Sequence, residues 1–351
     1  MKTNSMKWAA LLFAGALAGC NNSNEPVVDD DAPMQVTLGA NAKVTTKSAI
    51  DGTTIPADLD FSVWGMAKNA PTWADYATAT DRRSLFAGGG VTARVAEGKF
   101  NFTTPTYYPL ENALNYTFYG VAPATTATLE GEKLNVSYTV DGTQDVLWGY
   151  AAANDATKEQ KGFNAKYLRL EDGTTGDKPS IEFNHMLTRF TFIVKLGAAA
   201  NPTNLKVDKI QLNGVKNSFA FTMADKDVTT YAGVPAVTLT GDATDLPLVD
   251  DNGDVIATQA LVAEQVVGDM MIPTDGSITE VPLTTILSSD NTGSTPLQYN
   301  ATIRTADGSA FLPGKKYAVT MTVYPEREVE VWATLLEWED GVAIEDLPEI
   351  N

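Results

Sequence analysis

The sequence predicts an all-β protein built from antiparallel strands. Segments in which every second residue is apolar recur along the chain, and clusters of Gly, Asp, Asn and Pro separate them, as in half-buried strands joined by turns. No segment alternates strands and helices around a Gly-rich phosphate turn, and no repeat of fixed period occurs, which disfavours doubly wound folds, propellers and solenoids. The aligned apolar positions are Leu59, Phe61 and Val63; Phe100 and Phe102; Leu114, Tyr116 and Phe118; Phe190, Phe192, Val194 and Leu196; Phe219, Phe221 and Met223; and Tyr317, Val319, Met321 and Val323.

The length of the chain predicts two domains. It has 351 residues, 44% of them hydrophobic, which is enough for a sizeable core. The stretch Leu170–Ser180, LEDGTTGDKPS, has the composition of an exposed connection, and strands resume on both sides. We therefore expect an N-terminal β domain at 34–179 and a C-terminal one at 180–351, with a single sandwich carrying a long loop as the alternative. Short helices are expected at Thr72–Ala79 and Val281–Ser288.

The first 33 residues are expected to lie outside the fold. A short basic start precedes the apolar run Trp8–Leu17, which is too short to span a bilayer as a helix. The LAGC that ends at Cys20 resembles the lipobox of bacterial lipoproteins. This implies that residues 1–19 are a signal peptide and that Cys20 carries the lipid, including palmitate. The alternative is an ordinary signal peptide with a chance cysteine. Residues 20–33 are polar and contain Pro, which is typical of a flexible tether.

The composition disfavours several classes of function. A net charge of −19, from 25 Lys+Arg against 44 Asp+Glu, disfavours nucleic acid and anionic lipid surfaces as partners. One cysteine and one histidine, His185, provide neither a disulfide framework nor a Cys/His zinc set. The stretch 250–261 fails as a calcium loop, because Val255 replaces the required Gly and Leu261 replaces the required Glu. We expect no metal, no cofactor and no enzymatic activity.

Two weaker candidate sets remain. The carboxylates of EWEDG, Glu337–Gly341, are suited to acid–base work, but such clusters are common in an acidic chain. Tryptophans could stack on sugars, although aromatic residues of β proteins more often lie in the core; they are Trp64, Trp73, Trp148, Trp332 and Trp338.

The segment MQVTLGANAKVTTKSAI, Met34–Ile50, joins a strand pattern to two lysines. Met34, Val36, Leu38 and Ala40 alternate with polar or small residues, and Lys43 and Lys47 then interrupt the pattern. Alternation alone leaves three interpretations open: a permanent strand, a linker, or a piece that the mature protein discards.

Four stretches, taken in order, resemble the fimbrillin family, the lipoprotein precursors of type V pili in Bacteroidales. They are DFSVWG (Asp60–Gly65), PTYYPLENALNYTFYGVAP (Pro105–Pro123), FNAKYLRL followed by PSIEFNHMLTRFTFIV (within Phe163–Val194), and FLPGKKYAVTMTVYPEREVEVWATLLEWEDG (Phe311–Gly341). The resemblance implies two tandem antiparallel β-sandwich domains of the Greek-key, transthyretin-like kind. It also implies a lipid anchor in the outer membrane at the cell surface and assembly into fimbriae that serve adhesion.

The resemblance further implies how subunits join. A surface trypsin-like protease removes the N-terminal strand, and a strand from another pilin subunit fills the groove by donor-strand exchange. Carried onto this sequence, the removable strand holds Met34, Val36, Leu38 and Ala40, and the cut falls between Lys47 and Ser48, with Lys43 as second choice. The family's best-described pattern has an arginine before the cut, and no arginine precedes Arg82 here. The donor strand would lie at about Glu328–Trp338, with Val329, Val331, Ala333 and Leu335 on one face.

Three functions are therefore compared. In the first, the chain is a structural or accessory pilin that forms a homo- or hetero-polymer. In the second, it is a non-polymerising surface lipoprotein that binds glycan or host protein. In the third, which has the least support, it is a hydrolase with a carboxylate pair. The mature N-terminus distinguishes the first two.

Overall fold

The computed structural model describes residues 33–42, 55–110, 114–152, 162–165, 168, 178–197, 205–249, 259–260, 264–289, 296–323 and 330–336. The prediction of an all-β protein is confirmed: apart from a helical turn in which Leu168 N–H donates to Asn164 O (3.1 Å), the regular elements of these residues are strands. Within these residues no helix is long and apolar enough to cross a membrane. The strands are β1 (Gly39–Ala42), β2 (Asp60–Ala67), β3 (Gly90–Ala96), β4 (Lys99–Asn101), β5 (Tyr116–Ala122), β6 (Thr128–Glu130), β7 (Lys133–Thr139), β8 (Leu147–Ala151), β9 (Ser180–His185), β10 (Thr188–Leu196), β11 (Leu205–Asp225), β12 (Val237–Pro247), β13 (Gln259–Ala260), β14 (Glu264–Ile272), β15 (Val281–Ser289), β16 (Leu297–Ile303), β17 (Lys316–Val323) and β18 (Glu330–Leu336).

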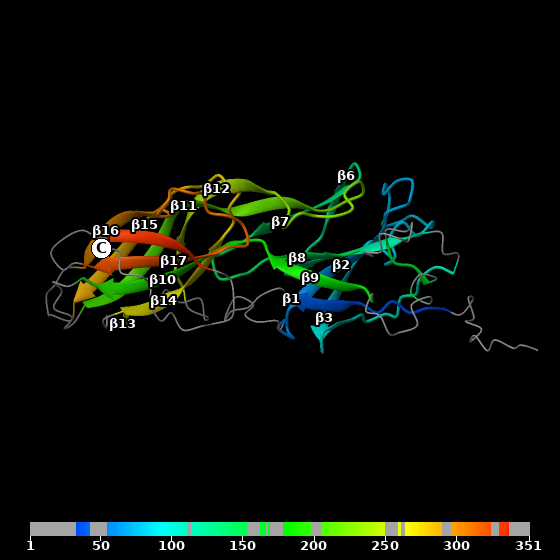
Figure 1. Cartoon of the computed structure of the whole chain (residues 1–351), viewed down its shortest axis with the longest axis horizontal. Coiled ribbons are helices and arrows are strands. Elements are labelled where there is room, and N and C mark those ends of the chain that lie inside the picture. The colour runs from blue at the N-terminus through cyan, green and yellow to red at the C-terminus, as the bar shows by residue number, and fades with distance from the viewer. Residues whose placement is uncertain are drawn as a thin grey trace, which may run out of the picture.

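The strands form three sheets along an elongated molecule (Figure 1). One sheet closes into a barrel in the order β1-β4-β3-β2-β5-β8-β9, with β9 paired back to β1. A four-stranded sheet has the order β14-β10-β17-β18, and a seven-stranded sheet has the path β16-β15-β11-β7-β6 with β12 and β13 attached to β11. In Figure 1 the barrel lies at the right and the four-stranded sheet at the left.

Two hydrophobic cores lie inside these sheets. The first is formed by the barrel strands, β7 and the last part of β11, and it includes Trp148, Phe183 and, from β11, Phe219. The second lies between the other two sheets and includes Phe190 from β10. The long strand β11 contributes to both, because its first half pairs with β15 and its last part pairs with β7. Ser180, where the sequence places the start of the C-terminal domain, is the first residue of β9 in the barrel.

The expectation of purely antiparallel sheets is wrong at two places. β1 runs parallel to β9, and β10 runs parallel to β17. Both pairs join strands that are far apart in the sequence, so no short turn links them. Side-chain alternation is the same in both orientations, and the sequence therefore carries no local signal of direction.

The two predicted helices are also wrong. Residues 281–289 are strand β15, which is paired on one side with β11 and on the other with β16. Residues 72–79 form turns, in which Ala79 N–H donates to Asp75 O (2.8 Å) and Asp75 has a φ of 55°. A positive φ in a residue other than Gly is incompatible with continuing an α-helix.

Candidate functional site: the slot of the N-terminal strand

The N-terminal segment 34–42 alternates between core and solvent. Val36 and Leu38 are only 2% and 1% exposed, and Ala40 and Ala42 are also buried, whereas Gln35, Thr37 and Asn41 are exposed. Met34 is partly buried against the same core. The apolar half of the segment therefore closes the barrel.

Backbone hydrogen bonds hold this segment on both sides. On one side, Gly39 N–H donates to Pro179 O (2.8 Å), and β1 continues parallel to β9 with Ala40 opposite Ile181 and Ala42 opposite Phe183. On the other side, the Phe100 N–H of β4 donates to Leu38 O (2.9 Å).

The first half of the segment has a second neighbour before β4 begins. Val36 N–H donates to Thr106 O (2.8 Å), and Tyr108 N–H donates to Met34 O (2.9 Å). We call the space between β9, β4 and Thr106–Tyr108 the slot.

Aromatic side chains form the floor of the slot. The Phe183 ring lies 4.8 Å from that of Phe61, and Phe100 lies 5.5 Å from Phe61, centroid to centroid. All three rings are buried. Since Phe100 and Phe183 belong to the two strands that flank β1, removal of β1 would expose their edges to water.

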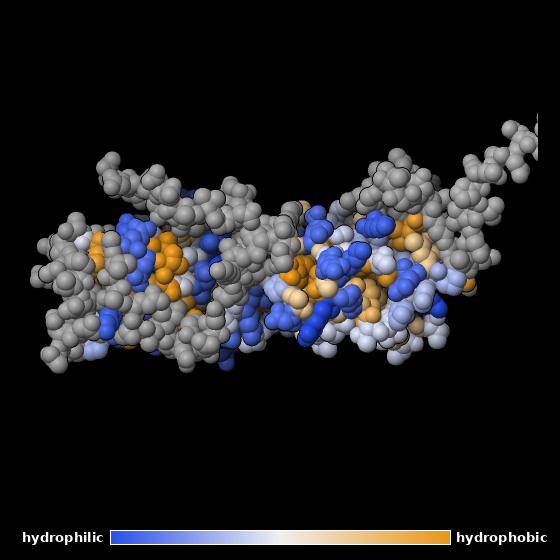
Figure 2. All heavy atoms as spheres, turned by 90° about the horizontal axis from the view of Figure 1, so that it is seen from below, coloured by the Kyte–Doolittle hydropathy of each residue, from blue (hydrophilic) through white to orange (hydrophobic). Residues whose placement is uncertain are grey.

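The C-terminal strand β18 lies in the other half of the molecule, at an edge of the four-stranded sheet. It pairs antiparallel with β17. Of the predicted donor residues, Val331 and Ala333 are buried, Leu335 is 56% exposed, and Val329 lies outside the residues whose side chains the structure describes. On the opposite face Trp332 is 52% exposed. Figure 2 shows that hydrophobic residues on one face of the molecule form separate patches interrupted by hydrophilic ones.

The other residues singled out from the sequence have structural surroundings. His185 Nδ1 lies 2.5 Å from Asp145 Oδ2, and both side chains are almost fully buried. Trp64, Trp73 and Trp148 lie in the core. No three His, Cys, Asp or Glu side chains in the described ranges gather into a metal site. Several predicted positions lie outside the described residues: Cys20, Lys43, Lys47, Ser48, the 250–258 part of the rejected calcium loop, and Glu337–Gly341 with Trp338.

The sequence did not point to a cleft beside the entrance of the slot. It has a volume of about 650 Å³ and is lined by Pro33, Thr80, Asp81, Arg82, Tyr107, Tyr108, Pro109, Leu110 and Leu114. Tyr107 and Leu110 are exposed apolar side chains. The adjacent tyrosines of TYYP, Tyr107 and Tyr108, were the one local pattern that could have indicated this cleft. Their role could not be read from the sequence, because the opposite wall is the loop 80–82, which is distant in the sequence.

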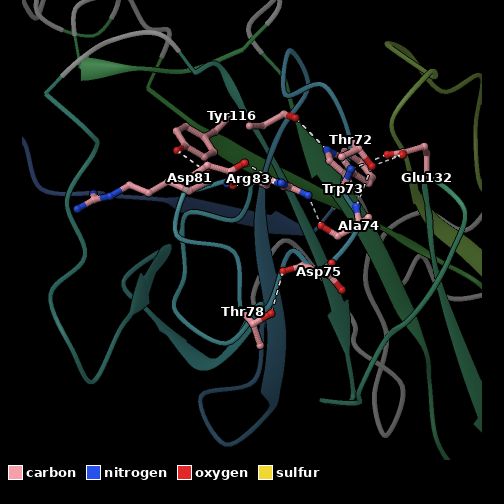
Figure 3. Close-up of polar contacts among 11 residues, drawn as sticks. Thr72, Trp73, Ala74, Asp75, Thr78, Asp81, Arg83, Tyr116 and Glu132 are labelled. Carbon is pink, nitrogen blue, oxygen red and sulfur yellow. Dashed lines mark hydrogen bonds and ion pairs between the residues drawn. The ribbon is translucent and has the colours of Figure 1, made fainter.

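The loop beside this cleft is fixed by specific contacts (Figure 3). Arg83 Nε donates to both carboxylate oxygens of Asp81 (2.9 and 2.7 Å), and Arg83 Nη1 donates to Ala74 O. The Tyr116 hydroxyl donates to Arg82 O (2.9 Å), and burial raises the pKa of that phenol. The hydroxyl therefore stays a hydrogen-bond donor over the physiological pH range.

Solved structures of similar chains were found by comparison. The crystal structure of a candidate cell adhesion protein from Bacteroides uniformis is similar with a TM-score of 0.52 and 15% identity, over 87% of this chain and 99% of that one. A fimbrial protein from Bacteroides vulgatus is similar with a TM-score of 0.46 and 12% identity, over 86% and 99% of the two chains. No protein with a curated description matches the chain.

The sequence profile of the fimbrillin-like family matches residues 43–338, which is most of the chain. The match begins directly after the segment that fills the slot. It spans the flanks of the slot, the second hydrophobic core, the first core apart from segment 34–42, and β18. The chain belongs to the fimbrillin-like family.

Proposed function

We propose that this protein is a structural or accessory subunit of a cell-surface pilus and that it assembles by strand exchange through the slot. Family membership supports a pilus-related or adhesive role at the cell surface and interaction with other pilin subunits. In the proposed mechanism the chain is exported as a lipoprotein and anchored through Cys20 in the outer membrane. Cleavage between Lys47 and Ser48, or after Lys43, then frees the segment 34–42.

The observation that carries this proposal is the way segment 34–42 completes the barrel. Its covalent link to the remaining strands runs through residues 43–54, and Lys43 and Lys47 lie in this stretch. A single cut there would leave the segment held by non-covalent contacts alone.

An emptied slot would cost the folded subunit a large part of its stability. Burial of Val36 and Leu38 contributes about 3–6 kcal/mol together. The backbone groups at the two flanks would exchange these hydrogen bonds for bonds to water, at a net loss of about 0.5–1.5 kcal/mol per bond. The sum approaches the net stability of a typical domain, which is about 5–15 kcal/mol. A cleaved subunit therefore needs a replacement strand.

A strand from a neighbouring subunit meets this need by β-augmentation. Main-chain hydrogen bonds to β9 and β4 would supply affinity, and alternate side chains would fill the positions of Val36, Leu38 and Ala40. We assign the donor to the C-terminal strand, with Val329, Val331, Ala333 and Leu335 pointing inward. Because donor and slot are different surfaces of the same chain, the contact is heterologous and propagates into a filament.

We also propose that the two cores correspond to two tandem folding units of the sandwich kind. The presence of β9 in the barrel favours a division after His185 over one before Ser180. The two units would share β11.

The mature N-terminus tests the proposal. Protein recovered from the cell surface is expected to begin at Ser48 and to form high-mass ladders that heat dissolves. The double variant Lys43→Ala with Lys47→Ala is expected to remain an uncleaved, lipid-anchored monomer, whereas Lys216→Ala, which changes an exposed lysine elsewhere, polymerises normally. Recovery of only lipidated, monomeric protein, or polymerisation of the double variant, would contradict strand exchange.

A further inference from the structure

The cleft at the entrance of the slot is large enough to hold a small ligand. Its volume of about 650 Å³ is in the range of small-molecule sites. The segment that precedes β1 enters at the end of the barrel farthest from the four-stranded sheet (Figure 1), and Pro33 of this segment lines the cleft. The cleft therefore lies at one end of the elongated molecule, away from β18.

The charges at this cleft favour an anion. Asp81 is neutralised by its two-oxygen ion pair with Arg83. In contrast, Arg82 is exposed, and no hydrogen bond or ion pair of its guanidinium group exists within the described part of the chain. Among the described residues, Arg82 is therefore a cation without an ion-pair partner at the mouth of this cleft, in a protein with a net charge of −19.

Arg82 is also held in a fixed and unusual backbone conformation. Its φ is 58°, a value that residues other than Gly adopt infrequently. The Tyr116 hydroxyl bonds to its carbonyl oxygen, and Arg83 O accepts from Ala67 N–H (2.8 Å). Strained residues that the surroundings hold in place are concentrated at functional sites. The backbone is thus preorganised to present the Arg82 side chain.

The remaining lining shows which class of anion fits. Tyr107 and Leu110 offer exposed apolar faces, and Thr80 offers a hydroxyl group. The buried Tyr108 hydroxyl has no hydrogen-bond partner among the residues that the structure describes. An apolar face beside hydroxyl groups suits a pyranose ring, which has a C–H face and a rim of hydroxyl groups. A guanidinium group binds a carboxylate through two parallel hydrogen bonds.

We propose that this cleft binds a carboxylate-bearing saccharide, with Arg82 on the carboxylate and Tyr107 against the sugar ring. The site lies in the uncleaved monomer and does not require strand exchange. A test on that monomer therefore separates this proposal from the assembly mechanism.

Ligand-observed NMR titrations of the uncleaved chain, residues 21–351, provide the test. The probes are N-acetylneuraminate and glucuronate as acidic sugars, glucose as the neutral sugar, and acetate as the free carboxylate. An acidic sugar is expected to bind more tightly than glucose and acetate. Arg82→Gln should weaken this binding about tenfold, the loss that corresponds to one charged hydrogen-bonded contact. Arg82→Lys should retain part of it.

The matched control is Arg304→Gln, which removes one exposed positive charge from the other half of the molecule. It is expected to leave the affinity unchanged. Tyr107→Ala should weaken binding of the acidic sugar and of glucose alike, because it removes the contact with the sugar ring and leaves the charge of Arg82 in place. Equal affinity of acidic and neutral sugars, absence of binding by both acidic sugars, or equal losses in Arg82→Gln and Arg304→Gln would overturn the proposal.

Discussion

Ala40 of β1 lies directly opposite Ile181 of β9 in a parallel pair, and both side chains are buried in the barrel. The two residues are separated by most of the barrel sequence, and no tight turn connects their strands. The pair is therefore a contact that any strand of suitable pattern could make, whether it comes from this chain or from another. This is the structural basis of the strand-exchange proposal.

Substitution of Leu38 is expected to destabilise the uncleaved chain. Leu38→Ala removes a fully buried side chain from the strand that closes the barrel, and such changes cost about 2–5 kcal/mol. The measurement is the free energy of unfolding by denaturant titration. Thr37→Ala, which changes the exposed neighbour, should stay within about 0.5 kcal/mol. Equal losses in the two variants would show that segment 34–42 does not pack as described.

Leu335 is expected to matter for assembly and not for folding. It is half exposed in the monomer, so Leu335→Asp should leave the unfolding transition almost unchanged. In a neighbouring slot the same residue would point inward with Val331 and Ala333, where a carboxylate is costly to bury, and polymer ladders should be lost.

Thr334→Asp is the matched control for that prediction. Thr334 is also exposed but lies on the alternate face, which would point to solvent in the slot as Thr37 does. This variant should polymerise. Loss of polymer in both variants, or in neither, would count against the assigned register.

Glu132 is expected to stabilise the contact between the β6–β7 turn and the loop 72–79. Its two carboxylate oxygens accept from Thr72 Oγ1 (2.5 Å) and from the Trp73 backbone N–H (2.6 Å), as Figure 3 shows. Glu132→Ala leaves the part-buried N–H group unpaired, at a cost of about 1–3 kcal/mol in unfolding free energy.

Two further variants sharpen the Glu132 prediction. Glu132→Gln keeps one acceptor oxygen, so its free energy of unfolding should fall less than that of Glu132→Ala. Glu130→Ala changes an exposed carboxylate of the same hairpin and should have little effect. If Glu130→Ala lowered the free energy of unfolding as much as Glu132→Ala, the charge of the hairpin, and not these two hydrogen bonds, would be the source of the stabilisation.

Lys68 is expected to make stability rise with pH in the weakly alkaline range. Its Nζ donates to Asp225 O (2.5 Å) and Val228 O (2.6 Å) and lies 5.5 Å from the Trp73 ring centroid. Burial lowers the pKa of Lys68 to about 8, while the attraction of Asp225 and Asp227 opposes this shift. A lysine in an unfolded chain has a pKa of about 10.4.

The sign of the effect follows from proton binding. Between these two pKa values the unfolded state binds more protons at Lys68 than the folded state does, so the free energy of unfolding increases as the pH rises. Denaturant titrations from about pH 8 to pH 9, where unfolded tyrosines are still largely protonated, should show this slope. Lys68→Met should flatten it, and Lys216→Met, at an exposed lysine, should not. The same slope in Lys68→Met and the wild type would exclude Lys68 as its source.

Local pattern in the sequence was enough to identify most strands and the alternation of segment 34–42. The side chains of Val36, Leu38 and Ala40 lie where a period of two places them, because that period is a property of the extended backbone itself. Short patterns gave a wrong prediction. The apolar positions in residues 281–289 are compatible with a short helix or with a strand, and pairing with β11 and β16 makes this segment a strand.

Only the tertiary structure decided which segments lie beside one another. Composition and spacing gave no sign that β1 runs parallel to β9, that β11 serves both cores, or that Arg82 and Tyr107 line one cleft. Alternation depends on a few neighbouring residues, whereas strand partners depend on the packing of side chains that are far apart in the sequence. The sequence thus determined that residues 34–42 have one apolar face, and the fold decided that this segment, which ends in β1, closes the barrel.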